Sequence, residues 1–439
     1  MPEVFAGFSR TDILGVPVLW KHDSRFKSFR LHLASRRALD QRAAARALLP
    51  GLLMQGTAQH RDRPALARRM EELYGASVNP VSGKVGETHV LRFAVDCVAG
   101  EFLPGRPDQL ADGLDLLTEL LARPMLEDGG FPAVVFERER RQAVHDARAV
   151  ADDRAAWAAQ QAMALACVGE PMAIPEHGGV PAIEALDRFA PEQARQDFLS
   201  RGELLVVGMG ALPEDAAFLA QVRTFLGSFL DAVHARQPEP VPPAVQRTVT
   251  ERRSAVERVD LQQSKLVLLF RVPWTDDPKT WMARALGVSM LGGGPHSRLF
   301  REVREKRSLA YYAQAGLDRH KGLLLVHVGL DEAAAGAVEA ETLGQLAQLA
   351  NGAFTGDELD TARAGILSTI TALTDGIRSH MQFVEDQWNL GLDRTPEDLF
   401  RSYLEIDAAQ VADSLSGIQL DFSYLLAPSA APAGVEVQA

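Results

Sequence analysis

The sequence lacks the features that define several common classes of protein. It has only two cysteines, Cys97 and Cys167, in 439 residues. Two cysteines are too few for a disulfide framework, so we expect ordinary buried thiols in a reducing compartment. No apolar run approaches the roughly 20 residues of a membrane-spanning helix, and the N-terminus lacks the regions of a secretory signal. These absences predict a cytoplasmic protein without membrane contact.

Familiar catalytic motifs are also missing. None of the 11 histidines lies three to five residues from another, so no helix can present two of them to one zinc ion. Gly292, Gly293 and Gly294 are followed by Pro-His-Ser, which fits neither a phosphate-binding loop nor a dinucleotide fingerprint. No G-x-S-x-G elbow is present. The glycines are more simply explained as a helix stop followed by a tight turn.

What the chain does contain is typical of a large soluble protein. Hydrophobic residues make up 46% and charged residues 24% of the sequence, which suits a substantial core. The length exceeds the size at which single cores usually stop growing, so we expect two or more domains. A formal charge of -12 argues against a nucleic-acid partner, which would require a basic face.

The two halves of the chain resemble each other. When the first half is shifted by 237 positions, the strand-like FRLHL (29–33) falls on LVLLF (266–270). The same shift aligns Gly56 with Gly293, Tyr74 with Tyr311 and Ala76 with Ala313. Further matches join 87–96 to 324–333 and 136–150 to 358–373. The repeated order of elements predicts an α+β fold of two homologous domains in tandem.

Composition suggests where these domains end. Four prolines between 236 and 246 favour an extended spacer. We expect an N-terminal domain at 1–235, a linker at 236–250, a C-terminal domain at 251–426 and a disordered tail at 427–439.

One apolar helical run has an unusual interruption. Pro50 and Gly51 lie in the middle of ALLPGLLMQGT (47–57), after a strong helix-forming stretch. Proline in a helix interior removes a hydrogen bond, and glycine adds an entropic cost. The pair predicts a break or an early end of this helix.

A second segment combines cations with tyrosines. In MLGGGPHSRLFREVREKRSLAYY (290–312), five basic residues lie between Arg298 and Arg307. Leu299 and Val303 recur at helical spacing, Ser297 is a suitable N-cap, and SLAYYAQAGL looks like a strand. This segment is either a solvated basic face over core aromatics, or a site whose guanidinium and phenol grip the carbonyls of an extended peptide.

These motifs resemble the pitrilysin/insulinase family, the inverzincin zinc peptidases that include mitochondrial processing peptidase. In that family a glycine-rich turn, S-R-L-F, R-E-K and L-A-Y recur in this order. ALLPGLLMQGT followed by 65–79 is similar to the family's metal-binding helix, H-x-x-E-H running into G-T, and FERERRQAVHD (136–146) to the helix of the third zinc ligand. The resemblance spans about 400 residues and implies two homologous α+β domains of the processing-peptidase fold.

The resemblance also shows what this chain has lost. Aligned on Gly-Thr, Ala47 stands at the first zinc histidine, Pro50 at the catalytic glutamate and Gly51 at the second histidine. Asp146 falls at the third ligand, with Glu139 one helical face earlier. Catalytic zinc needs three protein ligands, and the glutamate must take the proton of the bound water. The chain is therefore expected to hold no cofactor and to be inactive alone, with zinc present only in a catalytic partner.

The substrate-binding pair of the family is retained. By the motif R-E-K-x-x-L-A-Y, the substrate-binding arginine and tyrosine fall on Arg304 and Tyr311. The resemblance implies a non-catalytic subunit that pairs with an H-x-x-E-H homologue and helps to hold a peptide. Two alternatives remain open: a homodimeric peptide-binding or assembly protein without proteolysis, and an autonomous metal enzyme using Glu139, Asp146 and a histidine.

Overall fold

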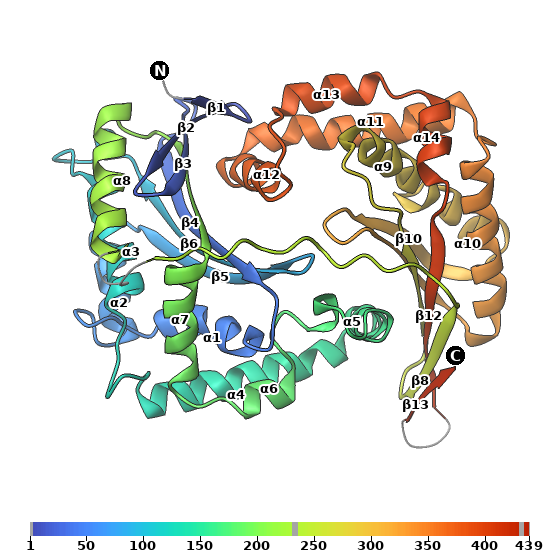
Figure 1. Ribbon diagram of the computed structural model, residues 1–439, viewed down its shortest axis with the longest axis horizontal. Coiled ribbons are helices and arrows are strands. Elements are labelled where there is room, and N and C mark those ends of the chain that lie inside the picture. Colours follow the sequence, from blue (N-terminus) through green and yellow to red (C-terminus); the bar gives the residue numbers. More distant parts are fainter. Residues whose placement is uncertain (1–2, 231–235, 430–433, 439) are drawn as a thin grey trace. The chain divides into compact units, whose positions relative to one another are not determined.

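The computed structural model describes residues 3–230, 236–429 and 434–438 (Figure 1). By contacts the chain divides into two compact units. Unit 1 contains 1–147, 174–243 and 373–395, and unit 2 contains 148–173, 244–372 and 396–439. One passage between the units lies at Pro243–Ala244, inside the range 236–250 that was expected to link two domains. The units also exchange two segments, 148–173 and 373–395, which no feature of the sequence had indicated.

Unit 1 is built on a seven-stranded sheet in the order β1-β2-β3-β7-β4-β6-β5. Its strands are β1 (Glu3–Phe5), β2 (Phe8–Ile13), β3 (Val16–His22), β4 (Ser28–Ala38), β5 (Ser77–Val85), β6 (Thr88–Val98) and β7 (Glu203–Gly210). Among the described strands of this sheet, only β3 and β7 pair in parallel. Alternate residues of a strand face opposite sides of a sheet. Leu31 and Leu33 of β4 accordingly join the main core, whereas His32 between them meets Glu385 of a helix on the other face.

The described residues of unit 1 form eight α-helices. They are α1 (Ala43–Leu53), α2 (Arg63–Glu72), α3 (Gln109–Ala122), α4 (Ala133–Ala149), α6 (Val180–Glu184), α7 (Ala190–Arg201), α8 (Asp215–Leu230) and α12 (Ile377–Asn389), with the last two residues of α4 counted in unit 2. Helix α3 packs on β6 and α8, α1 packs on β5 and α7, and α12 packs on β4 and β7. The sheet of unit 1 is thus covered on both faces.

Unit 2 repeats this plan with a six-stranded sheet in the order β10-β11-β9-β12-β8-β13. Its strands are β8 (Arg253–Val259), β9 (Ser264–Arg271), β10 (Ala310–Asp318), β11 (Leu323–Leu330), β12 (Gln419–Pro428) and β13 (Gly434–Gln438). The segment 427–439 was expected to be disordered, and here the structure differs. Strand β12 reaches Pro428, and the alternating GVEVQ of β13 pairs antiparallel with β8, while 430–433 and 439 lie outside the described residues.

The helices of unit 2 are α5 (Arg154–Ala166), α9 (Pro278–Gly292), α10 (Ala335–Ala350), α11 (Gly356–Ala372), α13 (Pro396–Leu404) and α14 (Ala408–Leu415). Helix α5 packs on β9 and β12. Its contact face carries Ala158, Ala162 and Ala166, which are fully buried and recur every four residues. Residues four apart lie on the same side of a helix, and their small side chains let α5 lie close to the sheet.

Aspartates define the start of several helices in both units. Each accepts a hydrogen bond from an amide of the first turn, which has no partner within the helix. These N-caps are Asp62 (α2), Asp108 (α3), Asp153 (α5), Asp277 (α9) and Asp407 (α14).

The predicted duplication is confirmed by the order of elements in the sheets. Strands β3-β7-β4-β6-β5 of unit 1 correspond to β8-β12-β9-β11-β10 of unit 2, including the single parallel pair of each set. Helices α3 and α4 correspond in the same way to α10 and α11. The next helix of each half, α5 or α12, belongs to the other unit. The predicted α+β fold of two homologous domains is therefore confirmed, and the exchange of these helices is added to it.

The predicted break at Pro50 was wrong. Helix α1 continues through Pro50 and Gly51 and ends at Leu53. Proline costs the helix one amide donor, but the carbonyl of Pro50 still accepts from the amide of Met54 at 3.3 Å. Leu48, Leu49 and Leu52 are buried on both sides of the interruption, so apolar packing offsets the local loss.

The basic segment was predicted more closely. Strand β10 begins at Ala310 and includes Tyr311 and Tyr312 of the expected strand. The preceding helix, however, is a π-helix at Leu299–Lys306 that begins after Arg298. The hydroxyl of Ser297 accepts only a long hydrogen bond, 3.5 Å, from the amide of Phe300. Buried Leu299 and Val303 form the apolar face that the spacing predicts.

Candidate functional site

The first candidate site lies where α1 meets α4. A Cβ atom built on Gly51 would lie 2.8 Å from Oε2 of Glu139. Position 51 of α1 and position 139 of α4 therefore face each other at contact distance. Because Gly51 has no side chain, the Glu139 carboxylate can occupy the space beside it.

A polar network fills this junction. Gln55, one turn after Gly51, donates to the Gly51 carbonyl at 3.1 Å. Arg138 donates from Nη2 to Oε1 of Gln55 at 2.5 Å and from Nε to Oε1 of Glu139 at 3.2 Å. The positive group beside Glu139 is thus a guanidinium supplied by the chain itself. Sequence reasoning missed Gln55 and Arg138, although the i, i+4 spacing of Gln55 from Gly51 was a usable signal.

The side chains at the three motif positions can do little chemistry. Ala47 has a methyl group, Pro50 a ring without a donor, and Gly51 no side chain, so none of them can ligate a metal or take a proton from water. Within the described residues, no group of three or more His, Cys, Asp or Glu side chains has the geometry to hold a metal ion.

The structure does not bring Asp146 to this junction. Asp146 is exposed on α4 and accepts a hydrogen bond from Gln142 at 2.8 Å. It lies seven residues beyond Glu139, about 10 Å along the helix axis. Glu139 is the carboxylate that faces Gly51, and the placement of Asp146 at the third-ligand position stays a prediction from the motif alignment.

Arg304 and Tyr311 form the second candidate site, in unit 2. Arg304 is exposed on the π-helix, with its guanidinium carbon 4.6 Å from the ring centre of Phe300. Tyr311 lies on β10, is 53% exposed, and donates from its hydroxyl to Asp331 at 3.2 Å. The hydrogen bond to the Asp331 carboxylate raises the pKa of the Tyr311 phenol, which keeps the hydroxyl as a donor. Each side chain has a partner within unit 2, and both remain accessible to a ligand.

The location of Tyr311 adds a feature that the motif did not show. Strand β10 is at the edge of its sheet and pairs only with β11 among the described strands. An edge strand presents unpaired amides and carbonyls to which an extended peptide can add. Arg304 precedes this strand and Tyr311 lies in it, so a cation and a phenol flank backbone groups suited to a peptide.

The two cysteines behave as predicted. Cys97 and Cys167 are buried and form no disulfide in the described part of the chain, and burial raises the pKa of the Cys97 thiol to about 12. Among the helices described, none combines the length and the apolar character needed to cross a membrane.

Comparisons with known proteins give a consistent assignment. Residues 192–366 match the family described as "Peptidase M16 inactive domain". The chain is 26% identical over 388 residues to "Probable inactive metalloprotease YmfF" of Bacillus subtilis, covering 87% of this chain and 88% of that protein. It is 25% identical over 305 residues to "Uncharacterized zinc protease Rv2782c" of Mycobacterium tuberculosis, covering 69% and 68%.

Solved structures show the same fold. A conserved protein from Enterococcus faecalis V583 superposes with a TM-score of 0.89 at 21% identity, over 97% of this chain and 99% of that chain. The crystal structure of a peptidase M16 inactive domain from Pseudomonas fluorescens superposes with a TM-score of 0.77 at 20% identity, over 97% and 99%. At these identities the likeness concerns the fold.

Proposed function

We propose that this chain is a peptidase-like member of the peptidase M16 (pitrilysin/insulinase) family and the non-catalytic subunit of a zinc peptidase. The match of residues 192–366 to the family described as "Peptidase M16 inactive domain" and the likeness to a relative named a probable inactive metalloprotease support this proposal. Its partner would be an H-x-x-E-H homologue that supplies the zinc, and the two chains would hold a peptide between catalytic and binding groups. No cofactor is assigned to this chain.

The observation that carries the proposal is the junction of α1 with α4. Zinc hydrolysis requires three ligands, an open position for water and a base that accepts the proton of that water. Ala47, Pro50 and Gly51 offer none of these groups. Arg138 places a guanidinium beside Glu139, the one carboxylate facing Gly51, and a positive charge there disfavours a divalent cation.

Arg304 and Tyr311 support a role in peptide binding. A guanidinium presents five N–H donors and a phenol presents one, all suited to peptide carbonyls or a terminal carboxylate. The Asp331 carboxylate orients the Tyr311 hydroxyl. A peptide added along β10 would have its backbone paired with the strand and its carbonyls within reach of both groups. In this proposal the two residues bind and orient the peptide and transfer no proton.

The proposal also assigns a compartment. Two buried cysteines without a disulfide favour the cytoplasm, where thiols stay reduced.

Co-expression tests the pairing. The chain should be co-expressed with an H-x-x-E-H homologue from the same genome, purified through a tag on one partner, and assayed on unstructured peptides. We expect a stable complex that cleaves peptides and loses activity with a zinc chelator. If the two chains neither co-purify nor gain activity together, the heterodimer is refuted; a homodimer by light scattering that binds peptides without cleavage would favour the partner-free alternative.

Substitutions test the assignment of the pair. In the active complex, Arg304→Ala and Tyr311→Phe should each raise KM for peptide cleavage, because each removes a donor to the substrate. Arg301→Ala is the matched control, since Arg301 is a partly exposed arginine on the same π-helix, 4.0 Å from Glu302. Unchanged kinetics for Arg304→Ala and Tyr311→Phe would remove these residues from the binding site.

A further inference from the structure

The contact between Arg304 and Phe300 gives the phenylalanine a place in the second candidate site. The guanidinium carbon of Arg304 lies 4.6 Å from the centre of the Phe300 ring, the shortest cation–ring distance among the described residues. A cation at this distance is attracted by the negative face of the ring. The ring therefore restricts where the end of the long Arg304 side chain lies.

The other basic residues of the segment 298–307 are held by carboxylates. These ion pairs are Arg298 with Glu358 at 2.9 Å, Arg301 and Lys306 with Glu302 at 4.0 and 2.7 Å, and Arg307 with Glu341 at 3.0 Å. Arg304 is exposed and forms no ion pair with any described residue. An aromatic ring thus holds Arg304 in place of a carboxylate.

This difference decides which hydrogen bonds Arg304 can still form. A carboxylate partner engages N–H groups in the plane of the guanidinium and neutralises its charge. A ring that stacks on the guanidinium contacts its flat face, so the five N–H donors around the edge stay available. Phe300 can therefore fix the position of Arg304 without using the donors that a peptide carbonyl needs.

The Phe300–Arg304 pair lies on a firmly packed element. Leu299 and Val303 of the π-helix are fully buried, and the helix packs on β10, α9 and α10. Phe300 is half-buried and stands four residues before Arg304, a spacing at which side chains on a helix surface are neighbours. π-Helices are rare and occur frequently at functional sites. The pair is thus held at a defined place directly before the edge strand β10.

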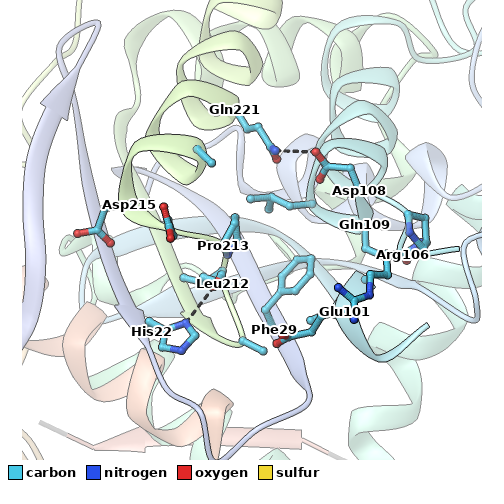
Figure 2. Close-up of a pocket in the computed structure, with 17 residues that line it drawn as sticks. His22, Phe29, Glu101, Arg106, Asp108, Gln109, Leu212, Pro213, Asp215 and Gln221 are labelled. Atoms are coloured by element: carbon cyan, nitrogen blue, oxygen red, sulfur yellow. Dashed lines mark hydrogen bonds between the residues drawn. The ribbon is translucent and has the colours of Figure 1, made fainter. Parts of the chain in front are cut away.

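The polar groups at the cavity of unit 1 show the opposite arrangement (Figure 2). Gln221 of α8 donates to Asp108, the N-cap of α3, at 2.8 Å. Nδ1 of His22, at the end of β3, lies 2.9 Å from the carbonyl oxygen of Leu212. These contacts tie neighbouring elements of unit 1 together, whereas no such contact uses the N–H groups of Arg304 among the described residues.

We propose that Phe300 is a positioning residue for peptide binding at β10. Its ring holds the Arg304 guanidinium so that the N–H groups can donate to a carbonyl of a peptide added to this strand. Because the side chain is already restricted, less conformational entropy is lost when the peptide binds. Phe300 itself forms no hydrogen bond to the peptide. The inference rests on the proposed role of Arg304 in peptide binding.

Peptide affinity measured on the full chain tests this role. The probe is fluorescein-labelled, carboxymethylated α-lactalbumin, an unfolded chain, and binding is followed by fluorescence anisotropy. Phe300→Leu removes the ring and should raise the Kd by about two- to fivefold, the factor expected of an exposed cation–π contact. Phe300→Tyr keeps the ring and should retain the wild-type Kd. Urea unfolding of each variant checks that it is folded under the assay conditions.

A matched control removes a ring from a comparable surface contact elsewhere. Phe102 in unit 1 is 47% exposed, and the ammonium of Lys27 lies 5.8 Å from its ring centre. Phe102→Leu should leave the Kd unchanged. A rise in the Kd equal to that of Phe300→Leu would show a general effect of losing an aromatic side chain and would overturn the inference.

A double-mutant cycle separates positioning from a structural role. If Phe300 acts through Arg304, adding Phe300→Leu to Arg304→Ala should raise the Kd no further. An equal rise in both backgrounds would show that Phe300 only supports the fold, and this result would refute the inference.

The same measurements distinguish failure of the inference from failure of the proposed function. If Arg304→Ala raises the Kd and Phe300→Leu does not, Phe300 has no positioning role and Arg304 keeps its place in the binding site. If the wild-type chain does not bind the probe, or Arg304→Ala leaves the Kd unchanged, the peptide-binding role of Arg304 is itself refuted, and the role of Phe300 with it.

Discussion

Replacing Arg271 by methionine is expected to loosen the exchanged helix α5. Arg271 of β9 is 7% exposed and binds Glu170 with two hydrogen bonds, at 2.6 and 2.9 Å. It also donates to the carbonyl of Ala166 at 3.1 Å and to Asp421 at 2.8 Å. Ala166 and Glu170 belong to the segment 148–173 that the first half of the chain contributes to unit 2. Arg271 therefore joins this segment directly to the sheet.

The size of the effect follows from what remains after the substitution. Breaking a buried ion pair by removing one partner costs about 3–5 kcal/mol, because the other charge is left uncompensated. Here Lys321 still lies 2.6 Å from Glu170, and Arg253 still lies 2.9 Å from Asp421. Each carboxylate keeps one cation, so we expect the lower end, about 3 kcal/mol.

Hydrogen exchange measured by mass spectrometry reads this effect locally. A loss of about 3 kcal/mol corresponds to roughly hundredfold faster exchange of the α5 amides where they exchange by local opening. Helix α12 in unit 1 is the internal reference and should not change. Lys306→Met, which removes an exposed pair with Glu302, should leave α5 unchanged. Less than tenfold acceleration in α5, or equal acceleration in α12, would refute the proposed role of Arg271.

Three further predictions concern unit 1. Burial alone would raise the pKa of Glu385, but the contacts of its carboxylate with His32 and Arg92 lower that pKa to about 2. Because the folded-state pKa is depressed, the ionised Glu385 stabilises the folded chain fully at pH values above its ordinary pKa of 4.5, and this stabilisation is lost as the pH falls toward 2. The difference in unfolding free energy between wild type and Glu385→Gln, from urea titrations, should therefore shrink by about 3 kcal/mol across this window; a constant difference would contradict the contacts. Pro50→Ala should raise the free energy of urea unfolding by about 1–2 kcal/mol. Alanine is favoured over proline in a helix by up to about 3 kcal/mol, which outweighs a loss of up to about 1 kcal/mol from the greater freedom of the unfolded chain. A free energy of unfolding below that of the wild type would show that the packing of the Pro50 ring outweighs this gain. Native Cys97 should resist thiol reagents at about pH 8 and react after unfolding, since its raised pKa suppresses the thiolate; rapid native labelling would disprove its burial.

The repeat in the sequence predicted the fold because it carried strand, helix and glycine in the same order twice. The match of 29–33 with 266–270 corresponds to β4 and β9, which occupy equivalent places in their sheets. The exchange of α5 and α12 left no such trace. Both helices keep their place in the order of elements along the chain. The sheet against which each helix packs depends on contacts between residues that are distant in the sequence, such as that of Arg271 with Glu170.

Local rules failed where tertiary packing decided the outcome. Pro50 predicted a break, but the buried leucines around it keep α1 continuous. The motif alignment named both Glu139 and Asp146, and only the folded structure shows that Glu139 faces Gly51.

Peptide cleavage by the purified chain in the presence of excess zinc, alone and mixed with an H-x-x-E-H homologue, tests the central claim most directly. We expect no cleavage by the chain alone, since Ala47, Pro50 and Gly51 provide neither ligands nor a base. The mixture should cleave, and Arg304→Ala should reduce its activity. Chelator-sensitive cleavage by the chain alone would contradict the account.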